Sequence, residues 1–448
     1  MYCCAICGAK GRCGWKSAVR CGWRSEGAGR RHGVSGRGRN RRGFLAAAGG
    51  VLGAAGLAPV LRAAEFKPEA PDWTKNLGPG VDAAPYGKPS PHEKHVIRRS
   101  VEWLTATPQS SVNFTPLHEL DGIVTPNGLC FERHHAGVPD IPPAEHKLLV
   151  HGLVERPLKF SMAELRRFPP TSVFHFLECA ANGGMEWRGA QLNGVQYTHG
   201  MLHCVQYTGV PLRLVLEAAG LKGQAKWLLL EGADAAAMTR SLPLAKALDD
   251  CLLAYSMNGE RLRSEQGYPL RLVVPGWEGN IWVKWLRRIE LGDQPWQTRE
   301  ETAKYTDLMP DGRARRFTWL QEVKSVITDP APEARLAGKG FRCIKGLAWS
   351  GEGRIARVDV SRDGGRNWTT ARLEPPVLPK CLTRFYLDWQ WSGEEVLLQS
   401  RAIDEKGFVQ PSPAVLQKTR GVNPIYHNNG IQTWAVNRDG TVENVRLG

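Results

Sequence analysis

The stretch HFLECAANGGMEW, residues 175–187, places a single cysteine between an apolar run and a series of small residues. Residues 172–178 predict a β-strand, and Ala-Ala-Asn-Gly-Gly follows Cys179. A side chain at the end of a strand can face a cleft, and small residues let a ligand approach the backbone closely. Cys179 is therefore a candidate nucleophile or metal ligand, although cysteine is also among the residue types most often buried for structural reasons.

A nucleophilic Cys179 would need a neighbouring base, and His175 is the histidine nearest to it in the sequence. Four residues along one strand place the two side chains on the same face but ~13 Å apart, which is too far for a hydrogen bond. This spacing disfavours a cysteine–histidine hydrolase at this position.

Strand and helix signals alternate between residues 147 and 291, which predicts a mixed α+β domain. The Ser161–Glu164 capping box and the glycine stop at Gly220 predict two short helices, the second over 210–219. The predicted strands lie at 147–160 (two strands joined by a glycine turn), 172–178, 226–231, 270–274 and 281–291. Residues 65–110 are rich in Pro, Gly and Lys and are expected to form an extended arm.

After residue 318 strand signals recur every eight to twelve residues, and helix signals are nearly absent. Turn sequences such as Asp363-Gly364-Gly365 separate the strands. This pattern is typical of a β-sandwich of ~100 residues. We therefore predict a leader over 1–64, a catalytic domain with its arm over 65–318, and a sandwich over 319–448.

The net charge of +15 is concentrated in the leader. Residues 1–64 carry ten arginines and two lysines against Glu26, so the remaining chain has a net charge of only +4. This distribution disfavours nucleic-acid binding. Arg41-Arg42, an Ala/Gly/Leu-rich core over 46–61 and Ala63-Ala64 form the three parts of a twin-arginine (Tat) export signal. We expect export of the folded chain to the periplasm, with no membrane span in the mature protein.

The cysteines add little to this organisation. Five of the eleven lie within residues 1–33, which have no apolar periodicity. A later start at Val34, read from a GTG codon, is an alternative that leaves residues 1–33 untranslated. The other six are widely and irregularly spaced, so no disulfide framework is predicted.

Three further motifs carry side chains that could bind an anion or a metal ion. The FERHH run at 131–135 presents an arginine fork suited to an anion. Arg271 and Lys284 flank a Pro-Gly turn, an arrangement that suits a phosphate or a pterin tail. His199, His203 and Cys204 could hold zinc if residues 199–203 formed one helix face, but Gly200 weakens that helix.

Together these segments resemble the sulfite oxidase family of molybdenum enzymes over residues 95–445. The resemblance rests on LECAANGG at 177–184, FERHH at 131–135, YPLRLVVPGWEGNIWVKWL at 268–286, and the sandwich sequence AWSGEGRIARVDVSRDGG at 348–365. It implies a molybdopterin-binding domain followed by an immunoglobulin-like dimerisation domain.

The resemblance also implies a cofactor and roles for individual residues. Cys179 would be the protein ligand of molybdenum held by molybdopterin, and Arg133 and Tyr305 would act on the substrate. No haem-attachment motif is present, so no haem is expected on this chain. Cofactor contacts are implied for Phe131, Glu132, Arg133, His134, His135, Cys179, Asp234, Gln266, Arg271, Trp282, Val283 and Lys284.

Three stretches, at 185–194, 292–297 and 300–319, resemble one branch of the family, the molybdenum subunit (SoxC) of sulfane dehydrogenase. This likeness implies oxidation of carrier-protein-bound sulfane sulfur in thiosulfate oxidation. Oxygen-atom transfer from molybdenum would pass electrons to a c-type cytochrome subunit (SoxD-like). The chain would be a homodimer within a hetero-oligomer.

Two glycines bear on the choice of substrate. Gly183 and Gly184 stand where enzymes for free sulfite have basic residues, which disfavours a small dianion as substrate. Alternatives are a sulfite:cytochrome c oxidoreductase on the same fold, a non-catalytic scaffold for Sox partners, and a zinc hydrolase at His199.

Overall fold

A computed structural model describes residues 89–101, 107–191 and 193–447. The predicted leader and the first part of the predicted arm lie outside these ranges. Residues 86–448 form one compact unit, so the boundary predicted at residue 318 stays a prediction. Within the described ranges, no helix is long and apolar enough to cross a membrane.

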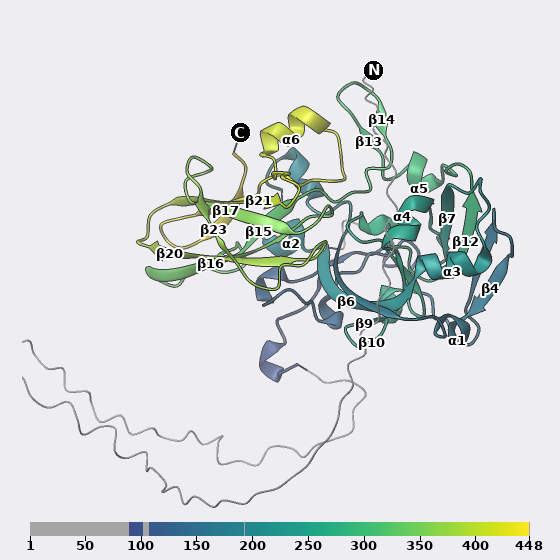
Figure 1. The fold of residues 1–448 in the computed structure, drawn as a ribbon. Coiled ribbons are helices and arrows are strands. Elements are labelled where there is room, and N and C mark those ends of the chain that lie inside the picture. The colour runs from purple at the N-terminus through teal and green to yellow at the C-terminus, as the bar shows by residue number, and fades with distance from the viewer. Residues whose placement is uncertain (1–88, 102–106, 192, 448) are drawn as a thin grey trace, which may run out of the picture. The chain divides into compact units, whose positions relative to one another are not determined.

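Two five-stranded sheets build the first half of the described chain (Figure 1). In the first sheet, β10, β9, β6 and β5 are neighbours in that order, β11 pairs with β9, and all pairs are antiparallel. The strands are β5 (Thr171–Glu178), β6 (Leu202–Pro211), β9 (Leu252–Met257), β10 (Glu260–Arg261) and β11 (Arg271–Val273). The β5–β6 pair presents the end of β5 beside the start of β6.

The second sheet has the order β4-β3-β12-β7-β8, with β12 parallel to β3. Its strands are β3 (Lys147–Gly152), β4 (Leu158–Ser161), β7 (Trp227–Gly232), β8 (Thr239–Pro243) and β12 (Leu286–Gly292). The helices of this half are short: α1 (Met162–Leu165), α2 (Val195–His199), α3 (Leu212–Ala219), α4 (Leu244–Asp249) and α5 (Arg299–Thr302). Small antiparallel pairs join β1 (Arg99–Ser100) to β2 (Asn113–Phe114) and β13 (Asp307–Leu308) to β14 (Ala314–Arg315).

Local signals explain several element ends. Glu164 closes the predicted capping box, since its carboxylate accepts a 2.7 Å hydrogen bond from the Ser161 backbone N–H. α3 stops at Gly220, where φ is +72°. The strand predicted over 281–291 is wrong at its start: a 3₁₀ turn, η8 (Gly279–Ile281), and Trp285 at φ +52° hold this segment as a loop until Leu286.

The last third of the described chain is a β-sandwich, green to yellow in Figure 1. One sheet has the order β15-β16-β20-β19, from β15 (Lys324–Asp329), β16 (Gly340–Trp349), β19 (Arg372–Leu373) and β20 (Thr383–Trp391). The other has the order β18-β17-β21-β22-β23, from β17 (Ile355–Ser361), β18 (Thr369–Thr370), β21 (Val396–Asp404), β22 (Thr433–Val436) and β23 (Val442–Val445). The sequence analysis did not predict β6, β8 or β9 of the first half, nor β22, β23 or the helix α6 (Pro413–Arg420) of the last third. The predicted α+β domain followed by a β-sandwich is otherwise confirmed.

One hydrophobic core joins the sandwich to the first half of the described chain. Phe176, Leu202 and Cys204 of β5 and β6 pack in the same cluster as Trp349 and Phe385 of the sandwich. Leu177, the next residue of β5, belongs instead to the core between the first two sheets. The end of β5 is therefore packed on both faces.

We predict that Phe176→Ala destabilises the protein by ~3–5 kcal/mol, because a fully buried ring in the shared core leaves a cavity. Urea unfolding monitored by tryptophan fluorescence measures this. Phe341→Ala is the matched control, since that ring is 67 % exposed, and should change stability by less than ~0.5 kcal/mol. Equal effects of the two substitutions would contradict the shared core.

Candidate functional site

Cys179 lies directly after the last residue of β5, as the sequence predicts. Its backbone N–H donates to the carbonyl oxygen of Met201 at 3.0 Å, and its own carbonyl accepts from the Asn182 N–H at 2.9 Å. Gly279 passes close by: a Cβ atom there would lie 2.9 Å from the Glu178 carbonyl oxygen and 3.4 Å from Cys179 Cα. This approach requires a glycine and fixes the loop at 279–285 against the end of β5.

An inner cavity of about 700 Å³, including space open to solvent, lies beside Cys179. The structure brings together around it all thirteen residues singled out from the sequence, and their roles stay predictions. They are Phe131, Glu132, Arg133, His134, His135, Cys179, Asp234, Gln266, Arg271, Trp282, Val283, Lys284 and Tyr305.

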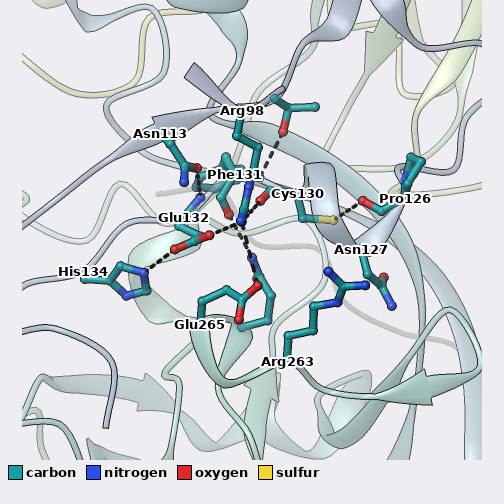
Figure 2. A network of polar contacts seen from close by, with 12 residues as sticks. Arg98, Asn113, Pro126, Asn127, Cys130, Phe131, Glu132, His134, Arg263 and Glu265 are labelled. Atoms are coloured by element: carbon teal, nitrogen blue, oxygen red, sulfur yellow. Dashed lines mark hydrogen bonds and ion pairs between the residues drawn. The ribbon is translucent and has the colours of Figure 1, made fainter. Parts of the chain in front are cut away.

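A chain of polar contacts holds the FERHH loop at one wall of this cavity. Figure 2 shows Glu132 between Arg98, with which it forms an ion pair, and His134, whose Nε2 lies 2.8 Å from its carboxylate. The Lys284 ammonium donates to His134 Nδ1 at 2.9 Å, so the ring proton is on Nε2 and is donated to Glu132. Burial lowers the pKa of His134, which favours this neutral form.

Two cations of the cavity wall, the buried Arg271 and the half-buried Lys284, have no carboxylate within ion-pair distance among the described residues. Lys284 donates to the carbonyl oxygens of Arg133 (3.1 Å) and Glu265 (3.0 Å), and burial lowers its pKa to about 7. Arg271 donates to the Gln266 carbonyl oxygen at 3.1 Å, while its buried Nε has no partner. An anionic ligand in the cavity would offset the burial of both charges.

A second, outer cavity adjoins the first and encloses about 2170 Å³, including space open to solvent. Arg133, His135, Cys179 and Tyr305 line both cavities and so form the border between them. The outer cavity carries three further cations and several large apolar side chains: Arg188, Arg299, Lys304, Met185, Trp187, Tyr197, Met201, Ile425 and Tyr426. It is the route by which a substrate can reach Cys179.

The border combines one guanidinium, that of Arg133, with two neutral rings, those of His135 and Tyr305. The Tyr305 hydroxyl lies 3.5 Å from His135 Nε2, and burial raises the pKa of Tyr305. Burial and the nearby Arg133 lower the pKa of His135 to about 4. Arg240 supports the tyrosine ring with its guanidinium 5.4 Å from the ring centroid. At neutral pH the border therefore presents the Arg133 cation, a neutral imidazole and a phenol.

The alternative sites from the sequence are not assembled. His175 Nδ1 lies 3.2 Å from the Lys380 carbonyl oxygen, and His175 lines neither cavity. His199 ends helix α2 whereas His203 lies in β6, so they do not share a helix face. Throughout the described ranges, no three His, Cys, Asp or Glu side chains are grouped so that they could hold a metal ion. The zinc alternative therefore has no support.

Sequence reasoning missed six residues of the inner cavity wall. Gly279, Asn280 and Trp285 lie inside the YPLRLVVPGWEGNIWVKWL run, which was quoted for the cofactor site without naming them. His203 was assigned to zinc instead. Leu177 and Met238 carry no polar signal that could have identified them.

Comparisons with known proteins define the class of protein. Residues 135–300 match the model of the oxidoreductase molybdopterin binding domain, and residues 315–434 match that of the Mo-co oxidoreductase dimerisation domain. The chain is 35 % identical to sulfite oxidase from Gallus gallus, covering 71 % of this chain and 75 % of that protein. Mitochondrial sulfite oxidase from Mus musculus is 32 % identical, over 80 % of this chain and 69 % of that protein.

These matches place the chain among molybdopterin-binding oxidoreductases. It belongs to the sulfite oxidase family, and the family resemblance found in its sequence is confirmed. A solved structure, the sulfane dehydrogenase SoxCD from Paracoccus pantotrophus, is similar with a TM-score of 0.83 at 56 % identity. The match covers 88 % of this chain and 100 % of that chain.

The cofactor of this family is molybdenum held by molybdopterin, and the inner cavity fits it. The uncompensated charges of Arg271 and Lys284 suit an anionic pterin phosphate, and the Cys179 thiol at the border suits a soft metal. Burial raises the pKa of Cys179, so a bound cation would be needed to keep the thiolate.

Burial of Lys284 predicts a pH dependence for the cofactor-free protein. Its folded pKa of about 7 is below its unfolded value, so between these values the unfolded state binds more protons and stability rises with pH. Compared with Lys284→Met, the cofactor-free wild type should gain up to ~1.4 kcal/mol per pH unit above pH 7. Denaturant unfolding at pH 7 to 10 measures this difference. Parallel pH profiles would contradict the burial of a charge.

Proposed function

We propose that this chain is the molybdenum subunit of a sulfane dehydrogenase, which oxidises sulfane sulfur carried on a protein. The observation that carries the proposal is the 56 % identity to SoxCD over all of that chain. The wide outer cavity in front of Cys179 supports it, because sulfur on a carrier arrives with its attached polypeptide.

The site residues divide into three roles under this proposal. Cys179 binds the metal. Arg271, Lys284 and Asp234 would hold the phosphate and pterin of the cofactor, and the FERHH loop with residues 266 and 282–283 forms the remaining wall of the cavity. When bound, the cofactor supplies oxygen-atom transfer and accepts two electrons for each oxygen atom transferred.

The border residues act on the substrate. Arg133 binds the negative charge of the terminal sulfur through charge-assisted hydrogen bonds. Neutral Tyr305 can donate its hydroxyl proton as a hydrogen bond, and neutral His135 accepts or donates without adding a charge. Together they orient the sulfur toward the Cys179 side of the border and limit the entry of water.

Two glycines that line the outer cavity favour the proposal that the substrate is larger than a free dianion. Gly183 has φ +78°, and a Cβ there would lie 3.3 Å from the Lys324 ammonium. A Cβ at Gly184 would overlap the Ile425 carbonyl oxygen. Gly184 therefore has no room for a side chain, and the positive φ of Gly183 strains any side chain there, so both positions disfavour the basic residues expected of an enzyme for free sulfite.

The same proposal extends to the location of the protein and to its partners. The twin-arginine leader would export the folded, cofactor-loaded chain to the periplasm. Electrons would leave to a SoxD-like c-type cytochrome subunit. The sandwich would form a homodimer within the larger complex, in keeping with its match to a dimerisation domain.

Two measurements test the proposal: the metal content of the protein and its relative activity on two substrates. Protein purified from the periplasm should carry near-stoichiometric molybdenum and no zinc, and Cys179→Ser should lose the activity while keeping the fold. With a SoxD-like cytochrome as acceptor, a carrier protein bearing a persulfide should be oxidised far faster than free sulfite.

Faster oxidation of free sulfite would assign the alternative function, a sulfite:cytochrome c oxidoreductase. Protein without molybdenum from a cofactor-competent host would favour the scaffold alternative. Unchanged turnover by Cys179→Ser would remove this residue as the metal ligand.

Arg133→Gln should weaken substrate binding by ~1.5–3 kcal/mol, about tenfold or more, because one charge-assisted contact to an anion is lost. Steady-state kinetics with the carrier substrate measure this as a rise in KM. Arg342→Gln, a substitution of an arginine in β16 that lines neither cavity, is the control. An unchanged KM in Arg133→Gln would contradict the role of this arginine.

A further inference from the structure

The carboxylate next to Cys179 is held by the sandwich. Glu178 is only 2 % exposed, and its Oε1 accepts from the Lys324 ammonium at 3.0 Å. Its Oε2 accepts from the indole N–H of Trp349 at 2.7 Å. Lys324 begins β15 and Trp349 ends β16, so both donors come from the first sheet of the sandwich.

The same lysine also binds the loop that follows Cys179. Its ammonium donates to the Asn182 carbonyl oxygen at 3.2 Å, and the Asn182 amide donates to Glu178 Oε1 at 2.9 Å. Gln321 adds a 3.2 Å hydrogen bond to the Glu178 carbonyl oxygen. Both the residue before Cys179 and the turn after it are therefore fixed by side chains that lie more than 140 residues away in the sequence.

The sandwich half also contacts the rest of this loop through its backbone. The His427 N–H donates to the Ala180 carbonyl oxygen at 2.7 Å. The Trp187 indole N–H donates to the Tyr426 carbonyl oxygen at 3.2 Å. The loop from Glu178 to Trp187 is thus bound to the sandwich half along its whole length.

Stability alone does not explain an ion pair at this place. Desolvation of two charges offsets much of their attraction, so a buried pair often stabilises no more than apolar residues of the same size. The two halves of the chain already share a hydrophobic core, and a second ion pair, Lys380 with Asp250 at 2.6 Å, joins them elsewhere. The distinguishing property of this pair is its position, because Glu178 directly precedes Cys179 and Lys324 binds both Glu178 and Asn182.

We propose that Glu178 and Lys324 are a positioning pair that aims the Cys179 side chain at the metal and balances the charge beside it. The inference rests on the proposed function of Cys179 as metal ligand. The ion pair and the Asn182 contacts restrict the backbone on both sides of the ligand. Because the two charges are opposite, removal of either one changes the electrostatic potential at the metal in a direction set by its sign.

Four variants test the proposal in the loaded enzyme: Glu178→Gln, Lys324→Met, the double variant and Lys324→Arg. Lys324→Met removes a positive charge and should lower the reduction potential of the molybdenum centre, because the reduced state carries more negative charge. Glu178→Gln should raise it, and the double variant should return it toward the wild-type value. Redox titration followed by the Mo(V) electron paramagnetic resonance signal measures this.

Kinetics provide a second readout. Lys324→Met should lower kcat by about tenfold to a hundredfold with little change in KM, because a misplaced ligand impairs the reaction more than substrate binding. Lys324→Arg keeps the charge and should recover most of kcat. Lys380→Met removes an ion pair between the two halves that does not involve the cysteine loop, and it should leave the potential unchanged.

The signs of the two shifts in reduction potential decide the inference. Shifts of the same sign in Glu178→Gln and Lys324→Met, or no shift in either, would overturn it. If Lys324→Met does not fold, Glu178→Gln and Lys324→Arg still test the sign of the shift and the recovery. Loss of molybdenum from the wild type, or its full retention and activity in Cys179→Ser, would refute the proposed function instead.

Discussion

The site depends on one constraint, the alternation of side chains between the two faces of the chain over residues 176–179. Successive strand residues point to opposite faces. Phe176 packs in the core shared with the sandwich, and Glu178 bonds the sandwich residue Lys324 on that same face. Leu177 and Cys179 lie on the other face, where both line the inner cavity. A register shift of one residue would bury the thiol and place a carboxylate at the metal.

The cations of the inner cavity wall are expected to lower the stability of the cofactor-free protein. Arg271 is buried and Lys284 half-buried without carboxylate partners among the described residues, and desolvation lowers the pKa of both. A protein that buries cations in this way is less stable alone than with an anionic ligand. Cofactor binding is therefore expected to contribute to folding stability as well as to chemistry.

The sequence predicted much of the site because its signals are local. Cys179 follows a recognisable strand, and FERHH and the segment at 268–286 are continuous runs that each supply one wall of the cavity. The strand predicted across 281–285 was wrong because contact with the end of β5 outweighs the β propensity of Ile-Trp-Val. The positions of Glu178 and Lys324 could not be predicted, since they depend on the packing of a second domain and no local pattern marks a buried lysine.

The same packing accounts for the two glycines of the cysteine loop. A Cβ at Gly184 would overlap the Ile425 carbonyl oxygen, so a side chain there would need the sandwich half to move. A Cβ at Gly183 would lie 3.3 Å from the Lys324 ammonium, and the φ of +78° also disfavours a side chain there. The sandwich half that holds the cysteine loop therefore also disfavours side chains at Gly183 and Gly184. Under the proposed role of Cys179, positioning of the metal ligand and exclusion of a free dianion would have one structural cause, the close contact between the cysteine loop and the sandwich half.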